Sequence, residues 1–150
     1  MNDLYHHGVK GMKWGVIKQR VKNRYDKGRA LTVLDSHSRS YGSNAKTYDK
    51  MSKKAQSKSE RYKEKGLTDL SAEYAKRSKT YAALGKAYVK AKLDTDVYMK
   101  DIKNNTLKAG RDYVVKSKQT FSTNTYTIYD ADGNERYSAT YSSTPLYIGG

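Results

Sequence analysis

The chain has 150 residues, no cysteine, and 30 Lys+Arg against 15 Asp+Glu, a formal net charge of +15. The lack of cysteine excludes disulfides and cysteine zinc sites, and no apolar run forms a signal peptide or approaches the ~20 residues of a membrane span. Aliphatic residues are scarce while tyrosine occurs 15 times, so we expect one small domain, or a tail plus a domain, with a thin tyrosine-rich core.

Residues 1–16 form a glycine-rich segment that contains the only tryptophan of the chain. Three glycines within eight residues disfavour a regular helix. This combination is typical of a linear peptide whose aromatic anchor is buried either by the rest of the domain or by a partner. We therefore predict a terminal recognition peptide, with the partner-binding side chains Tyr5, His6, His7, Val9, Met12 and Trp14.

The run YHHGVKGMKWGV, from Tyr5 to Val16, resembles a short motif of proteins encoded by tailed phages and prophages of Gram-positive bacteria. Such proteins tend to be encoded in or near the head-morphogenesis genes, and the motif lies at a terminus of otherwise dissimilar chains. The resemblance implies a tag-like element that places its carrier in the phage particle. It names no activity. The motif is usually followed by more arginine than the Ile17-Lys18-Gln19-Arg20 found here.

Residues 17–42 predict a basic helix followed by a linker. Ile17, Val21 and Tyr25 share one helical face, surrounded by lysine and arginine. Gly28 either ends or interrupts this helix, and the apolar residues after it either resume the helix or form an extended run. Residues 35–43 are rich in serine and predict a loop.

Residues 43–110 predict a helical region. Tyrosines recur there at multiples of seven in two series, which is helical spacing. Gly66 is placed to cap the first helix, and Thr68 to Ser71 supply capping residues for the second. We predict a basic antiparallel helical hairpin with a seam through Tyr41, Tyr48, Tyr62, Tyr74, Tyr81 and Tyr88. A third helix is predicted to begin at Asp94–Asp96 and to end at Gly110.

Residues 111–150 predict an antiparallel β-meander. Two runs of period two, 126–129 and 137–141, flank a turn that contains Asp132-Gly133, and residues 112–121 make a third strand. Alternation sends Tyr126 and Tyr129 to opposite faces, so outward rings could form a protein-binding surface. One face of the meander needs a cover, for which we expect the tyrosine hairpin, giving an α+β fold with further helices packed on a small sheet.

The positive charge is concentrated in the helical region. Residues 36–93 hold 15 Lys+Arg against five Asp+Glu. Such charge either keeps a weakly packed protein soluble or contacts the phosphate backbone of DNA or RNA, or an acidic protein. The excess of lysine over arginine favours point contacts to phosphate over base readout. The predicted polyanion-binding residues are Lys46, Lys50, Lys53, Lys54, Lys58, Arg61, Lys76, Arg77, Lys79, Lys86 and Lys90.

The sequence offers no constellation for catalysis, metal or cofactor binding. His6 and His7 have no further ligand at metal spacing, and the Asp130–Asn134 turn places Gly133 at the fourth position of a calcium loop, where the sixth is required. Phosphate loops, serine elbows and convincing carboxylate pairs are absent. We expect a protein without enzymatic activity and without a cofactor.

Three functions fit these features. The first is a phage head-associated or packaged accessory protein, in the virion or the host cytoplasm, that contacts capsid and nucleic-acid backbone. The second is an inhibitor of a bacterial defence system, of the anti-CRISPR type, that binds a nuclease or its nucleic acid. The third is a general nucleic-acid-binding protein without a role in the virion. None of the three requires a membrane.

Overall fold

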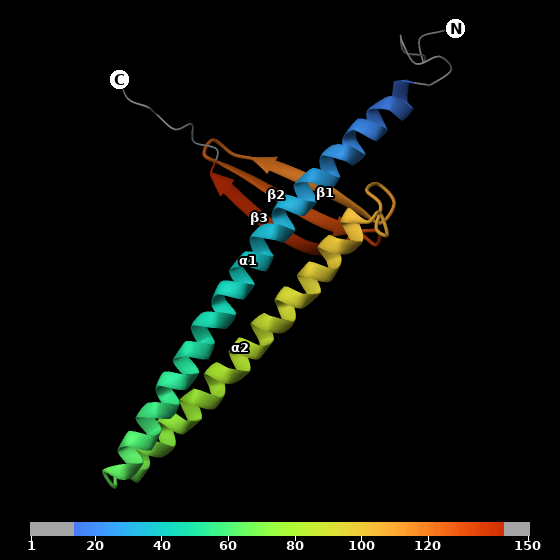
Figure 1. Ribbon diagram of the computed structural model, residues 1–150. Helices are drawn as coiled ribbons and strands as arrows, with labels where there is room; N and C mark the ends of the chain where they lie inside the picture. The colour runs from blue at the N-terminus through green and yellow to red at the C-terminus, as the bar shows by residue number, and fades with distance from the viewer. Residues whose placement is uncertain (1–13, 143–150) are drawn as a thin grey trace, which may run out of the picture. The chain divides into compact units, whose positions relative to one another are not determined.

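The structure, a computed structural model, describes residues 14–142, in which two long helices precede a three-stranded sheet (Figure 1). This confirms the predicted α+β class, with a helical pair and a C-terminal antiparallel sheet. The chain divides into two compact units, one made of the described residues up to Leu34 and from Tyr98 onward, the other of Asp35–Val97. The elements are α1 (Trp14–Glu64), α2 (Thr68–Lys103), β1 (Tyr113–Gln119), β2 (Thr123–Asp130) and β3 (Glu135–Ser142).

The unit Asp35–Val97 is a helical hairpin whose reversal is set by Gly66. This glycine has φ 75°, a conformation that L side chains rarely adopt. Its N–H donates to the carbonyl of Lys63 at 3.1 Å, and the N–H of Leu67 donates to that of Tyr62 at 2.9 Å. These two bonds form a Schellman motif that satisfies the last carbonyls of α1. The predicted cap at Gly66 is confirmed.

The tyrosines spaced at multiples of seven meet across this hairpin. The ring centroids of Tyr48 and Tyr88 lie 5.6 Å apart at an interplanar angle of 9°, and those of Tyr62 and Tyr74 lie 5.4 Å apart. Tyr41 also reaches Tyr88, at 6.1 Å. Ring pairs at these separations attract beyond the effect of burial alone. The predicted tyrosine seam is confirmed.

Serines alternate with the tyrosines along the seam and exchange hydrogen bonds between the helices. The hydroxyls of Ser52 and Ser78 each donate to the backbone carbonyl of the other residue, at 3.0 and 2.9 Å. Ser59 and Ser71 repeat the arrangement at 2.7 and 2.8 Å. A hydroxyl reaches the opposite backbone only where the two helices run close together, which small side chains permit. A small residue and a large ring thus recur every seven residues, except that Ala55 takes the place of a tyrosine on α1.

The predicted loop over residues 35–43 is wrong, because α1 runs through this segment, and through Gly28, without a break. Ser38 in this stretch continues the small-residue series of the seam. Ser38 is buried and donates to Asp96 on α2. A Cβ on Gly42 would lie 3.2 Å from the side chain of Lys92. Small residues in this stretch serve close helix packing, and not a flexible connection.

The predicted third helix is also wrong, because the residues expected to cap it lie inside α2. Thr95 is fully buried, and its hydroxyl donates to the carbonyl of Ala91 at 2.8 Å within the same helix. Asp96 accepts hydrogen bonds from Ser38 and from Lys92. These polar side chains are satisfied by tertiary and intrahelical contacts, so α2 continues to Lys103 and ends before Gly110.

The sheet of the other unit has the strand order β1-β2-β3, antiparallel throughout. At the β2–β3 turn the carboxylate of Asp130 accepts the N–H groups of Asp132 and Asn134, at 3.0 and 2.9 Å, and Gly133 has φ 82°. The predicted meander, including the strand within residues 112–121, is confirmed. The turn explains the spacing of these acids without a calcium ion.

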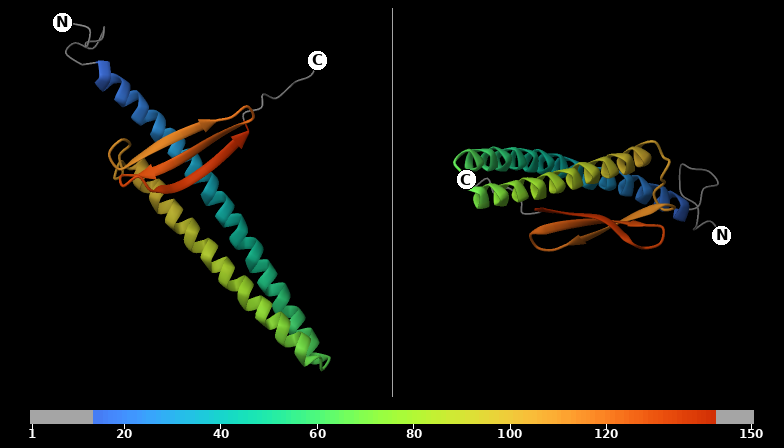
Figure 2. Two further views of the ribbon diagram at one scale, coloured as in Figure 1. Left: turned by 180° about the vertical axis from the view of Figure 1, so that it is seen from behind. Right: turned by 90° about the horizontal axis from the view of Figure 1, so that it is seen from below.

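One hydrophobic core joins this sheet to two helical segments. Figure 2 (right) shows the ribbon of the sheet beside the helices of this unit. The segments are residues 30–34 of α1 and 99–102 of α2, so they lie outside the tyrosine hairpin that we expected to supply the cover. They provide branched aliphatic side chains, which fill the core more completely than tyrosines with a polar hydroxyl. The buried members are Ala30, Val33, Leu34, Met99, Ile102, Tyr113, Val115 and Ile128.

Asp26 ties α1 to the backbone of β1. Its side chain accepts the N–H of Val115 at 3.3 Å and the ammonium of Lys22 at 2.7 Å, while the residue is only 3% exposed. β1 pairs with β2 alone among the described strands, so this N–H needs a partner from outside the sheet. A charge-assisted bond provides it.

Gly85 provides a test of the close approach between the helices. Gly85→Ala should stabilise the hairpin by up to about 1 kcal/mol, since glycine costs that much in a helix interior and the nearest atom to a Cβ, on Tyr48, would lie at 3.6 Å. Gly85→Leu should destabilise it by about 1–3 kcal/mol through overpacking. Urea unfolding followed by circular dichroism measures both, and equal stability of the two variants would contradict the packing described.

Tyr113 provides a test of the second core. The residue is 1% exposed, and its hydroxyl has no hydrogen-bond partner among the described residues. Burial, with a smaller effect of the Asp26 carboxylate, raises the pKa of Tyr113 to about 12. The unfolded residue ionises near pH ~10, so the contribution of the neutral phenol to stability is complete below that pH and is lost as the pH rises toward 12.

Tyr113→Phe should therefore raise the free energy of unfolding at neutral pH by about 1 kcal/mol, because it removes an unsatisfied buried hydroxyl. It should also reduce the loss of stability above pH ~10. Urea titrations at several alkaline pH values measure both effects. Tyr25→Phe, at an exposed position, is the matched control and should change neither. Parallel losses in wild type and Tyr113→Phe would show that this phenol does not control the alkaline transition.

Candidate polyanion-binding surface

All eleven predicted polyanion-binding side chains are exposed, and all lie on the hairpin Asp35–Val97. They occupy helix positions outside the seam, because the seam positions hold small residues and tyrosines. Six come from α1 and five from α2. On α1 they are Lys46, Lys50, Lys53, Lys54, Lys58 and Arg61, and on α2 they are Lys76, Arg77, Lys79, Lys86 and Lys90.

The structure does not gather these cations on a single face. At about 100° per residue, their offsets from the seam divide them between two flanks and the outer sides of the helices. Lys46 and Lys86 line a groove on the flank next to Gly85, and Lys54, Lys58 and Arg77 line another on the tyrosine flank. The positive charge therefore surrounds the hairpin.

Some of these cations are paired with carboxylates on the same helix. Lys53 contacts Asp49 at 3.0 Å, and Arg77 contacts Glu73 at 2.7 Å. Exposed pairs of this type contribute only a few tenths of a kcal/mol, about 0.3–0.5, and they do not neutralise the hairpin. Asp35–Val97 contains 15 Lys+Arg against 8 Asp+Glu, so a net positive charge of seven remains after every acid is counted.

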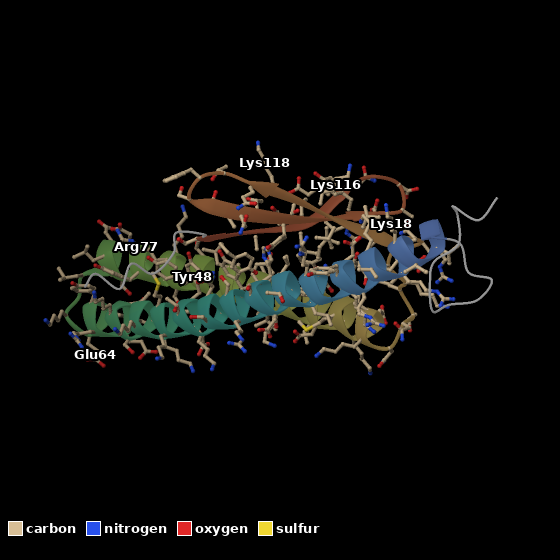
Figure 3. The ribbon with its side chains drawn as sticks, turned by 90° about the horizontal axis from the view of Figure 1, so that it is seen from above. Lys18, Tyr48, Glu64, Arg77, Lys116 and Lys118 are labelled. Atoms are coloured by element: carbon tan, nitrogen blue, oxygen red, sulfur yellow. The ribbon has the colours of Figure 1, made fainter. Side chains whose placement is uncertain are left out.

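One groove on the hairpin is built around Tyr74. Two cations contact the ring, with Nζ of Lys58 at 5.4 Å and Cζ of Arg77 at 4.9 Å from its centroid. Figure 3 labels Arg77 on this hairpin. The groove has a volume of about 190 Å³ and is called the Tyr74 groove below; its lining is Met51, Lys54, Ala55, Lys58, Tyr74, Arg77 and Tyr81.

The chemistry of the Tyr74 groove favours an anionic group next to an apolar one. Three cations converge from two helices, and residues 50–59 of α1 contain no acid. Contact with the Tyr74 ring restrains Lys58 and Arg77 before any ligand arrives, which reduces the entropy lost on binding. Arg77 also forms an ion pair with Glu73 on the same helix. The arrangement can hold a phosphate group.

The sequence identified Lys58 and Arg77 separately, but it did not predict that they meet over one ring. That contact depends on the register between the helices. The seven-residue spacing of the serines could have revealed it, since the pairs Ser59–Ser71 and Ser52–Ser78 fix which residues lie opposite. Of these serines, Ser71 was expected only as a capping residue of the second helix.

The predicted recognition peptide is not tested by the structure. Tyr5, His6, His7, Val9 and Met12 lie outside the described residues. Trp14 is the first residue of α1, and its side chain is likewise outside the description. Partner binding by this peptide stays a prediction.

Within residues 14–142, no three His, Asp or Glu side chains come together in a way that could hold a metal ion. Neither of the two helices described contains a stretch apolar enough to cross a membrane.

Comparison with known proteins gives a match at the N-terminus. A family described as "Family of unknown function (DUF7211)" matches residues 1–21, a range that includes the run from Tyr5 to Val16. No curated protein matches the chain, and no solved structure matches it. The family match concerns the N-terminal segment, and the hairpin and sheet lie outside it.

Proposed function

We propose that this protein is a non-enzymatic accessory protein of a tailed phage or prophage, carried with the head, whose helical hairpin binds the phosphate backbone of nucleic acid. The observation that carries this proposal is the excess of exposed cations on Asp35–Val97, which contains 15 Lys+Arg and 8 Asp+Glu. A folded hairpin presents them without depending on the aliphatic core of the other unit. The phage context is supported by the resemblance of residues 5–16 to the terminal motif.

The composition of the surface favours binding without sequence specificity. Nine of the eleven cations are lysines, which contact phosphate as point charges, whereas base readout relies mainly on the planar fork of arginine. Their distribution on two flanks and on the outer sides lets nucleic acid approach from several directions. This suits a densely packed polymer better than a single defined binding site.

Duplex binding should depend steeply on salt. If six of these side chains contact phosphate at once, the logarithm of the association constant should fall against the logarithm of the salt concentration with a slope of about −5. Replacing Lys54, Lys58 and Arg77 with glutamine should make the slope shallower by about 2–3. Fluorescence anisotropy with a labelled random-sequence duplex measures both.

The matched control replaces Lys100, Lys103 and Lys108 with glutamine. These exposed lysines lie in the other unit, and their replacement removes the same net charge as the hairpin variant. The control should change the slope much less than the hairpin variant does. Equal changes would mean that net charge alone drives binding, and a flat salt response in the wild type would exclude the proposed phosphate contacts.

Association with the phage particle is a separate prediction. Mass spectrometry of particles purified from a host that carries the gene should detect the chain, and deletion of residues 1–16 should remove it from them, because the resemblance implies that this segment directs placement. A variant with glutamine at Lys54, Lys58 and Arg77 should still reach the particle. Absence of the intact chain from particles would refute the head-associated role.

A further inference from the structure

The sheet has a second basic surface, on the face opposite its hydrophobic core. Tyr113 and Val115 of β1 point into the core, so alternation places Val114, Lys116 and Lys118 on the other face. Figure 3 shows Lys116 and Lys118 on the side of the sheet away from the helices of this unit. We call this the outer face of the sheet.

Two rows of residues cross the outer face in register, and each row combines a lysine with hydroxyl groups. The hydroxyls on β2 and β3 are bonded to each other, at 3.1 Å in the first row and 2.9 Å in the second. Neither row contains an acid. The rows are Lys116, Thr127 and Ser138, and then Lys118, Thr125 and Thr140.

An aromatic ring lies at one end of these rows. Tyr129 follows the core residue Ile128 and therefore faces outward, and Nζ of Lys116 lies 5.0 Å from its ring centroid. The two residues, with Val114 and Arg111, line a hollow of about 350 Å³. The Asp130 carboxylate at its rim accepts two N–H groups of the β2–β3 turn, and its other oxygen lies 3.9 Å from a guanidinium nitrogen of Arg136.

A second ring lies at the other end of the sheet. Phe121, the only phenylalanine of the chain, is fully exposed at the tip of the β1–β2 turn. The turn itself is closed by Thr120 and Thr123, through a backbone bond of 2.8 Å and a hydroxyl contact of 2.6 Å. Tight turns favour Gly, Asn, Asp or Ser. An exposed phenylalanine there does not contribute to the turn or to the core.

We propose that the outer face of the sheet, from Tyr129 to Phe121, binds single-stranded nucleic acid. Bases stack on the two rings, and the backbone between them lies along Lys116 and Lys118. Single strands expose the base faces that aromatic side chains stack on, whereas a duplex hides them, and cations along the path contact phosphate. Because the surface uses no residue of the hairpin, this inference does not depend on the function proposed for Asp35–Val97.

The test uses the full chain and a labelled single-stranded oligothymidylate, with a duplex of the same length for comparison. Anisotropy is measured at moderate salt, where contacts to phosphate alone are weak. Phe121→Ala and Tyr129→Leu should each weaken binding of the single strand about tenfold, with little effect on the duplex. Tyr129→Phe keeps the ring and should retain wild-type affinity. Circular dichroism should show that each variant is folded.

Charge variants separate this surface from the hairpin. Glutamine at Lys116 and Lys118 should weaken the single strand, whereas glutamine at Lys54, Lys58 and Arg77 should mainly weaken the duplex. Unchanged single-strand affinity in folded Phe121→Ala and Tyr129→Leu would overturn the inference. So would equal losses for single strand and duplex in the Lys116 and Lys118 variant, or displacement of the oligonucleotide by millimolar inorganic phosphate, since either would mean a surface that reads charge alone.

Discussion

The hairpin Asp35–Val97 depends on the close approach of two helix backbones. Serine hydroxyls that donate across the interface to carbonyls of the opposite helix require this approach and also stabilise it. A buried hydroxyl that is hydrogen-bonded avoids the cost of an unsatisfied polar group, so the hairpin is held together with few aliphatic residues. The tyrosines then bury ring surface next to each small pair and leave their hydroxyl ends at the wet edge.

This seam also explains why so much charge is tolerated. Since small residues and rings occupy the interface positions, lysine and arginine lie only at positions that face water or the edges of the seam. There, contacts such as those of Lys58 and Arg77 with Tyr74 order the side chains without neutralising them. The scaffold and the proposed polyanion surface follow from the same seven-residue repeat.

The unit that contains the sheet is built on different chemistry. Its core is largely aliphatic and includes two buried polar groups. The Asp26 carboxylate accepts the N–H of Val115 on β1, and the Tyr113 hydroxyl has no hydrogen-bond partner among the described residues. The core covers one face of the sheet, and the outer face carries the threonine and serine hydroxyls, Lys116, Lys118 and Tyr129. The two units thus present different surfaces, one with distributed charge and one with charge placed between aromatic rings.

The sequence by itself determined the local features of this protein: the helical spacing of the tyrosines, the cap at Gly66, the Asp130–Asn134 turn and the exposure of the cations. Each follows from the periodicity or conformational preference of a few neighbouring residues. Only the tertiary structure decided that Ser38 and Thr95 lie inside continuous helices, that residues 30–34 and 99–102 supply the core of the sheet, and that Lys58 and Arg77 share one ring. The physical reason is that a serine or an aspartate satisfies its hydrogen bonds equally well in a loop, at a cap or across a helix interface. The choice among these depends on a partner distant in sequence, which no local pattern contains.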